Sequence, residues 1–106
     1  MPRVSKKTDP AAQFAANAEE AADFLRLLAN EHRLMILCRL GETEEMGAGA
    51  LVEASGLSQS ALSQHLARLR EDGLVETRRD GVSIYYRLTD DRVRVVVGAL
   101  KKVFCP

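Results

Sequence analysis

The 106-residue sequence predicts a mainly α-helical fold with one small β-hairpin, in the order of four helices, two strands and a final helix. Three observations lead to this prediction. Apolar residues recur at helical spacing through most of the chain, a short segment around residue 85 alternates between apolar and polar residues, and Asp80-Gly81 is typical of a hairpin turn. We expect a single domain over residues 10–106, preceded by a flexible basic arm over residues 1–9.

Two helices are expected before the centre of the chain. In the first, apolar residues advance by four, three, four and three positions, which forms a heptad-like seam of Phe14, Ala18, Ala21, Leu25 and Leu28. The second is expected over Glu31–Leu40, where Asn30 precedes it and Gly41 stops it. It carries a local apolar patch of Leu34, Leu37 and Cys38.

A helix-turn-helix is predicted at about residues 48–72. A short helix over Ala50–Ser55 leads through the tight turn Gly56-Leu57-Ser58 into a second helix, which Ser58 caps and Gly73 ends. The spacing of Leu62, Leu66 and Leu69 marks the buried stripe of this second helix.

The opposite face of the second helix carries amides and hydroxyls. A solvated helix surface is the plain alternative, but such surfaces are usually rich in Glu and Lys, which the first two turns lack. Amides and hydroxyls can pair with base edges in a DNA major groove and with phosphates. The residues expected to contact DNA from this helix are Ser58, Gln59, Ser60, Ser63, Gln64, His65 and Arg68.

A wing is predicted at about residues 74–88. Val82, Ile84, Tyr86 and Leu88 alternate with Ser83, Tyr85 and Arg87, as in a strand with one buried face. Arginines near the tip of such a hairpin can reach phosphates or the adjacent minor groove, whereas the alternative is an edge ribbon whose charge prevents aggregation. The residues expected to contact DNA from the wing are Arg78, Arg79, Ser83, Tyr85 and Arg87. Together these elements predict a winged helix-turn-helix.

The last helix, capped by Thr89 or Asp90, has a continuous apolar stripe of Val93, Val96, Val97, Leu100, Val103 and Phe104. The first and last helices could each pack on the core of their own chain. Since they lie at the two ends of a small chain, we expect them instead to form a homodimer whose twofold axis matches an inverted repeat in the DNA. The expected interface residues are Phe14, Ala18, Ala21, Leu25, Val93, Val97, Leu100 and Phe104.

Composition limits the possible functions. Fifteen basic and fifteen acidic residues give a formal net charge of zero, which excludes a strongly basic DNA-coating protein but not a local basic patch. No apolar run approaches the length of about twenty residues that spans a bilayer, and the N-terminus lacks the apolar core of a secretory signal, so we expect a cytoplasmic protein. Without a nucleophile-base motif, a phosphate loop or a paired acid and base, an enzyme is the least expected class.

Residues 22–88 resemble the ArsR/SmtB-type repressors. The resemblance rests on four linked motifs in the expected order: Leu28–Leu37 leading to Ser58–Leu66, then Leu69–Val75, Arg79-Asp80-Gly81 and Tyr85–Leu88. It implies a dimeric winged-helix repressor that binds double-stranded operator DNA and releases it when an inducer binds, often a metal ion. It also implies that the first and last helices form the dimer interface.

The metal sites of that family do not transfer to this chain. Where the arsenic and lead or cadmium sensors carry a Cys-x-Cys pair, this sequence has Gly47-Ala48-Gly49, and the last helix lacks the His and Glu ligands of the zinc and nickel sensors. The two histidines, His32 and His65, are far apart in sequence and neither lies at ligand spacing from a cysteine. We therefore expect no metal and no cofactor.

The two cysteines, Cys38 and Cys105, remain as candidate sensing residues. Cytosolic thiols are kept reduced, so a structural disulfide is not expected, and Cys38 in its apolar helix could be a small buried hydrophobe. Cys105, next to the end of the chain, should be open to reaction. We expect the last helix to run back toward the helix that carries Cys38, so that both thiols face each other within one subunit.

This pair resembles the persulfide-sensing, SqrR/BigR-like branch of the family, in which one cysteine precedes the helix-turn-helix and the other lies near the end of the last helix. The resemblance implies that reactive sulfur species join Cys38 and Cys105 through a bridge of several sulfur atoms and so release genes of the sulfide response. Two alternatives stay open: a general thiol oxidant sensor that forms a direct disulfide, and a protein-interaction winged helix whose thiols are inert.

Overall fold

The computed structural model describes residues 9–105, and within them the predicted mainly α-helical fold with a β-hairpin wing is confirmed. All of the expected basic arm except Asp9 lies outside the described residues. The elements follow in the order α1 (Pro10–Leu28), α2 (Glu31–Gly41), β1 (Met46–Gly47), α3 (Ala48–Ser55), α4 (Gln59–Glu71), β2 (Val75–Asp80), β3 (Ser83–Leu88) and α5 (Asp91–Phe104). Strand β1 is the one element here that the sequence did not predict.

Side-chain caps determine where the helices begin. The carboxamide oxygen of Asn30 accepts hydrogen bonds from the backbone N–H groups of His32 and Arg33, at 3.0 and 3.1 Å. The hydroxyl of Ser58 accepts one from Ala61 N–H at 3.1 Å, so both predicted caps are confirmed. Of the two candidate caps for α5, Asp90 is the one used, while the hydroxyl of Thr89 donates to the carbonyl of Gly73.

The core lies where α2, α3, α4 and α5 meet the base of the wing. It contains the predicted leucine stripe of α4, and its buried residues are Leu28, Ile36, Leu37, Leu40, Leu51, Leu62, Leu66, Leu69, Leu74, Val75, Val93 and Val97. Gly56 and Gly73 lie on either side of α4 and have φ angles of +71° and +75°. A residue with a side chain would be strained in this left-handed conformation. These two turns set the direction of α4 relative to α3 and to the wing.

The turn of the wing lies one residue later than predicted. Asp80 pairs with Ser83 across the antiparallel ladder of β2 and β3, so the two loop residues are Gly81 and Val82 rather than Asp80 and Gly81. Gly81 alone has a positive φ, +64°, which suits the first position of a two-residue turn. As a result Val82, expected on the buried face, is fully exposed at the tip.

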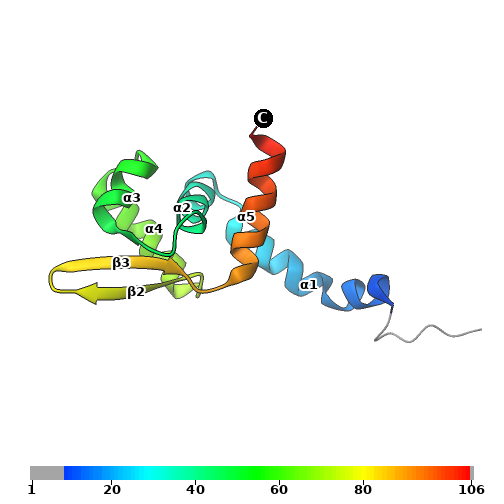
Figure 1. Ribbon diagram of the computed structural model, residues 1–106. Coiled ribbons are helices and arrows are strands. Elements are labelled where there is room, and N and C mark those ends of the chain that lie inside the picture. The colour runs from blue at the N-terminus through cyan, green and yellow to red at the C-terminus, as the bar shows by residue number, and fades with distance from the viewer. Residues whose placement is uncertain (1–8, 106) are drawn as a thin grey trace, which may run out of the picture.

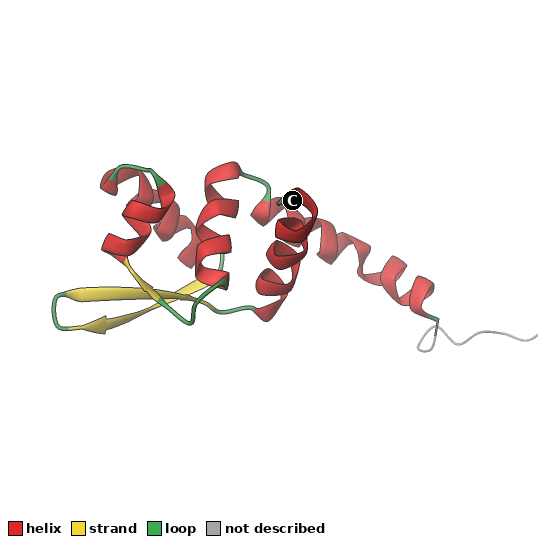
Figure 2. Ribbon diagram, turned by 45° about the horizontal axis from the view of Figure 1, so that its top comes forward, coloured by secondary structure: helices red, strands yellow, loops and turns green. Residues whose placement is uncertain are grey.

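A three-stranded antiparallel sheet results because β1 pairs with β3, matching Met46 with Tyr86 and Gly47 with Tyr85. In Figures 1 and 2 the wing extends from the helical body on the side opposite to α1, and α3 and α4 lie beside it. α5 packs against α2 and stands between α2 and α1. None of the helices described here is long and apolar enough to cross a membrane.

Two residues expected in a dimer interface belong instead to the core. Val93 is 0 % exposed and Val97 is 5 % exposed, because this face of α5 packs onto α2 within the same chain. The sequence correctly predicts an apolar stripe on α5, but a stripe of six residues covers two adjoining faces of the helix. One of those faces is used within the subunit.

Candidate functional site

The polar face of α4 is open to solvent. Ser58, Gln59, Ser60, Ser63, Gln64 and Arg68 are exposed, and the leucine stripe holds the opposite face of the helix in the core. Because Ser58 caps the helix and Gly56 precedes it in a left-handed conformation, the N-terminal half of α4 projects its amides and hydroxyls together. These groups can donate to and accept from base edges without the cost of desolvating a full charge.

His65 differs from its neighbours because it is half-buried against a second histidine. The ring centroids of His65 on α4 and His32 on α2 lie 5.4 Å apart, with the planes tilted by 50°. This pair is not predictable from the sequence, since no spacing rule connects residues on two different helices. The two rings pack α4 against α2, so His65 has a packing role in addition to any contact with DNA.

The structure brings the wing and α4 to one groove. An open hollow of about 460 Å³ is bordered by Gln59 and Ser63 of α4 and by Ser83 and Tyr85 of β3. Gly47, Ala48 and Gly49 also line the hollow, with small side chains or none. Residues predicted separately from the helix and from the ribbon therefore form one continuous surface.

The arginines of the wing are not equivalent. Arg78 donates to the carboxylate of Glu45 at 2.5 Å, and its guanidinium carbon lies 4.6 Å from the centroid of the Tyr85 ring. Hydrogen bonding from Arg78 lowers the pKa of Glu45, so the carboxylate is ionised and the pair is charged.

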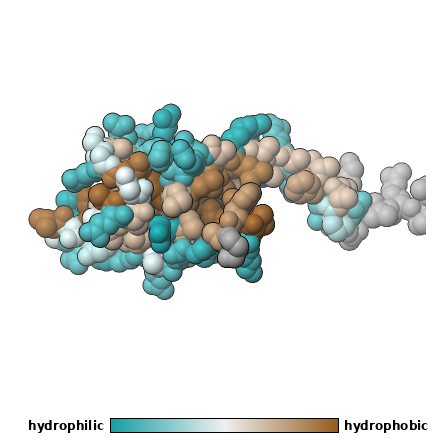
Figure 3. Space-filling view, turned by 90° about the horizontal axis from the view of Figure 1, so that it is seen from above, coloured by the Kyte–Doolittle hydropathy of each residue, from teal (hydrophilic) through white to brown (hydrophobic). Residues whose placement is uncertain are grey.

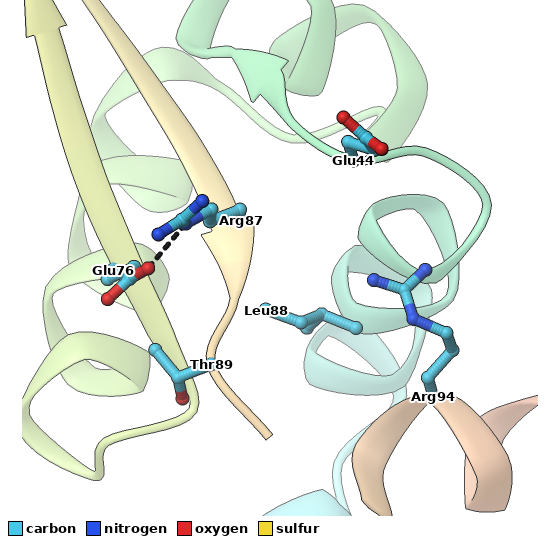
Figure 4. A pocket seen from close by; sticks show the side chains of 6 residues that line it. All are labelled: Glu44, Glu76, Arg87, Leu88, Thr89 and Arg94. Carbon is cyan, nitrogen blue, oxygen red and sulfur yellow. Dashed lines mark hydrogen bonds and ion pairs between the residues drawn. The ribbon is translucent and has the colours of Figure 1, made fainter. Parts of the chain in front are cut away.

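Arg87 pairs across the strands with Glu76 at the base of the wing, beside Leu88 and Thr89 (Figure 4). Arg79, by contrast, is exposed and has no ion pair among residues 9–105. The three arginines were predicted as one cluster, but Arg79 is the one whose charge is uncompensated within the described part of the chain.

Cys38 borders an ion pair between α2 and α5. The carboxylate oxygen Oε1 of Glu42 lies 3.8 Å from the sulfur of Cys38 and 2.6 Å from Nζ of Lys101. Lys101 is on the last turn of α5, one helical turn before Cys105, which follows the end of that helix. Hydrogen bonding to Glu42 raises the pKa of Lys101, and the charges of Cys38 and Cys105 add to this shift. Lys101 is therefore linked to Cys38 through Glu42, and it precedes Cys105 by four residues.

The thiols have different environments. Cys38 is half-buried on α2, and burial raises the pKa of its thiol, with a further rise from the charge of Glu42. Cys105 is exposed at the C-terminal end of α5. No group of three or more His, Cys, Asp or Glu side chains that could hold a metal ion is found among the described residues.

An apolar groove lies between α1 and α5. It has a volume of about 510 Å³ and is bordered by Phe14, Ala21 and Leu25 of α1 and by Val95 of α5. Phe14 is 66 % exposed, Val95 is 70 % exposed and Phe104 is 76 % exposed. Figure 3 shows hydrophobic side chains gathered where α5 points toward the viewer and continuing onto the base of α1.

Comparison with protein families matches residues 30–77 to the model described as "Bacterial regulatory protein, arsR family". The match covers the last residue of the α1–α2 turn, then α2, β1, α3 and α4, and the first three residues of β2.

The chain is 43 % identical over 95 residues to the HTH-type transcriptional regulator YgaV of Escherichia coli, covering 90 % of this chain and 96 % of that protein. It is 44 % identical over 93 residues to the transcriptional activator HlyU of Vibrio cholerae, covering 88 % of this chain and 85 % of that protein. The crystal structure of the transcriptional repressor BigR from Xylella fastidiosa superposes with a TM-score of 0.84 at 40 % identity, covering 92 % of this chain and 99 % of that one. All three are similar over nearly their whole length.

Proposed function

Because this chain belongs to the arsR family of bacterial regulatory proteins, we propose that it is a homodimeric, DNA-binding transcriptional repressor that releases its operator when reactive sulfur species link Cys38 and Cys105. The observation that supports the sensing part is the ion pair of Glu42 and Lys101, which lies beside Cys38 and one helical turn before Cys105. DNA binding rests on the open polar face of α4 and on the groove that it shares with the wing.

The proposed DNA contacts fall into two classes. In this proposal the exposed residues Gln59, Ser63 and Gln64 read base edges in the major groove, while exposed Arg79 and Arg68 supply charge for phosphates. Contacts to phosphates position the protein, and amide contacts to bases discriminate sequence. The remaining residues proposed for this surface are Ser58, Ser60, His65, Arg78, Ser83, Tyr85 and Arg87.

The proposed dimer uses the apolar surfaces that the subunit leaves uncovered. Only the C-terminal part of α1 packs on the core of its own chain, through buried Leu28 and partly buried Phe24 and Leu27, while residues 13–20 are exposed. An exposed apolar helix of this length is typical of an interaction surface. A twofold pairing through Phe14, Ala18, Ala21, Leu25, Leu100 and Phe104 would cover it and place two α4 helices on successive major-groove turns.

The proposed sensing chemistry needs no separate oxidant when the donor is an organic trisulfide, R–S–S–S–R. The Cys105 thiolate attacks the central sulfur, a terminal S–S bond breaks and one thiolate RS⁻ leaves. The Cys38 thiolate then attacks the same central sulfur and expels the second RS⁻, which leaves Cys38–S–S–S–Cys105. The two cysteine sulfurs are oxidised, and the two terminal sulfurs of the donor are reduced.

A bridge of this kind would tie the end of α5 to α2. Since α5 also borders the proposed dimer interface, fixing it to α2 would favour one arrangement of the two subunits over the other. Release of DNA follows if the linked arrangement no longer places both α4 helices on their half-sites. The added sulfur also extends the reach of the link beyond that of a direct disulfide.

A gel-shift assay tests this proposal. Reduced protein is mixed with DNA from upstream of its own coding sequence, and glutathione trisulfide is added. We expect the complex to dissociate, while the double variant Cys38→Ser, Cys105→Ser stays bound. Intact mass should rise by one sulfur atom less two hydrogens.

Other outcomes identify the alternatives. Release by peroxide with loss of two hydrogens and no added sulfur indicates a sensor that uses a direct disulfide. DNA binding that does not weaken steeply with salt indicates that the winged helix has another partner. Because a relative is an activator, a reporter fused to the operator decides the direction of regulation: deletion of a repressor raises expression.

A further inference from the structure

One carboxylate oxygen serves both the thiol of Cys38 and the ammonium of Lys101. Oε1 of Glu42 lies 3.8 Å from Sγ of Cys38, within the range of a weak S–H···O hydrogen bond, and 2.6 Å from Nζ of Lys101. A carboxylate accepts from a thiol but repels a thiolate. Glu42 therefore favours the protonated form of Cys38, whereas Lys101 favours the thiolate.

Two cations, Arg39 and Lys101, also act on the Cys38 thiol. On α2, Nη1 of Arg39 lies 3.8 Å from Oε2 of Glu42 and its charge favours the thiolate weakly. On α5, the charged group that faces Cys38 is Lys101. Burial raises the pKa of Cys38 most, the charge of Glu42 raises it next, and Lys101 lowers it.

The loop that carries Glu42 is fixed by α5. Arg94 extends from α5 and donates to the backbone carbonyls of Gly41 and Thr43, on either side of Glu42 (Figure 4 shows Arg94 reaching toward this loop). Arg94 and Lys101 are seven residues apart, so they lie on the same face of the helix. The carboxylate is thus held in place by its backbone as well as by its ion pair.

On the premise of the proposed function, we propose that the Glu42–Lys101 ion pair sets the order in which the two cysteines react. Glu42 keeps Cys38 in the neutral form, so exposed Cys105 makes the first attack on the sulfur donor. Cys38 then acts as the second nucleophile, with Lys101 as the cation that stabilises its thiolate. Glu42 and Lys101 are positioning residues in this scheme, because neither exchanges a bond with sulfur.

The test measures the rate at which iodoacetamide alkylates Cys38 in the full-length protein as a function of pH, followed by peptide mass spectrometry. In Glu42→Gln the rate profile of Cys38 should shift to lower pH, so that the rate at pH 8 rises by about three- to tenfold, the effect of half to one unit of pKa. In Lys101→Met it should shift to higher pH and the rate at pH 8 should fall. Lys101→Arg keeps the cation and should preserve the wild-type profile.

Glu44→Gln is the matched control, because it removes the same charge from the same loop on the side that faces Arg94 (Figure 4). A Cys38 profile unchanged in Glu42→Gln overturns the proposal. A shift of the Cys38 profile toward lower pH in both Glu42→Gln and Lys101→Met also overturns the proposal. Such a result would mean that looser packing exposes Cys38 in both variants, whatever the charge removed. The assay contains neither DNA nor a sulfur donor, so its result is independent of whether trisulfide releases the operator.

Discussion

Arg33 of α2 donates a hydrogen bond of 2.9 Å to the carboxylate of Asp72, the residue that follows the last turn of α4. The same nitrogen donates to the carbonyl of Leu27 in α1 at 2.8 Å, and the Arg33 side chain is 12 % exposed. One guanidinium therefore connects α1, on the proposed dimer side, with α4, on the proposed DNA side. The contact therefore helps to fix the orientation of the proposed DNA surface relative to the proposed dimer surface.

Replacing Arg33 with Met should destabilise the protein. The change leaves the Leu27 carbonyl and the Asp72 carboxylate without their donor, and we expect a loss of about 1–3 kcal/mol in the free energy of unfolding. Urea denaturation measures it. Arg70→Met, which changes an exposed arginine on α4, is the control and should stay within about 0.5 kcal/mol of wild type. Equal losses in the two variants would contradict a specific role for Arg33.

Gln64→Ala should weaken operator binding without weakening the fold. Gln64 is exposed on α4, so its side chain stabilises little in the free protein. A bidentate amide–base contact contributes about 1–3 kcal/mol of discrimination, which corresponds to a loss of roughly fivefold to 150-fold in affinity. Fluorescence anisotropy with labelled operator measures the affinity, and thermal melting checks the fold. Gln13→Ala on α1 should bind as wild type, and wild-type affinity in Gln64→Ala would argue against readout by this face.

Phe14→Glu should dissociate the proposed dimer. Phe14 is 66 % exposed in the subunit and borders the apolar groove between α1 and α5, so a charge there would have to be buried on association. We expect the dimer dissociation constant, measured by analytical ultracentrifugation, to rise more than about tenfold. Ala16→Glu adds the same charge on the opposite face of α1 and should leave association unchanged. A similar effect of both variants would show that the interface lies elsewhere.

Acid should weaken the start of α5 through Asp90. Hydrogen bonds from Arg92 lower the pKa of Asp90 below its ordinary value of 3.8. The pKa of Asp90 is lower in the folded protein than in the unfolded protein, so ionised Asp90 stabilises the fold. This stabilisation is fully present above the pKa of the unfolded state, and it is lost as the pH falls through the pKa of the folded state. The melting temperature of the wild type should therefore fall more between pH 5 and about 3 than that of Asp90→Asn, which keeps a capping oxygen but cannot titrate. Glu53→Gln, on α3, is the control and should follow the wild type; identical pH profiles for wild type and Asp90→Asn would rule out this contribution.

Local rules predicted most elements because their causes are local. Ser58 and Asn30 cap helices through their own side chains, and the leucine spacing of α4 requires a buried stripe. The same rules failed at the wing tip, where strand register rather than composition selects the turn residues. They also missed β1, since two residues such as Met46 and Gly47 become a strand only when β3 lies beside them.

The sequence by itself determined the helix-turn-helix, the wing, the polar character of α4 and the presence of two thiols, because capping, periodicity and residue chemistry act over a few neighbours. Only the tertiary structure decided that Val93 and Val97 are used in the core and that the rings of His32 and His65 meet. It alone also decided that Glu42 and Lys101 stand beside Cys38. These outcomes depend on how α2, α4 and α5 pack, and packing joins residues whose separation along the chain carries no signal.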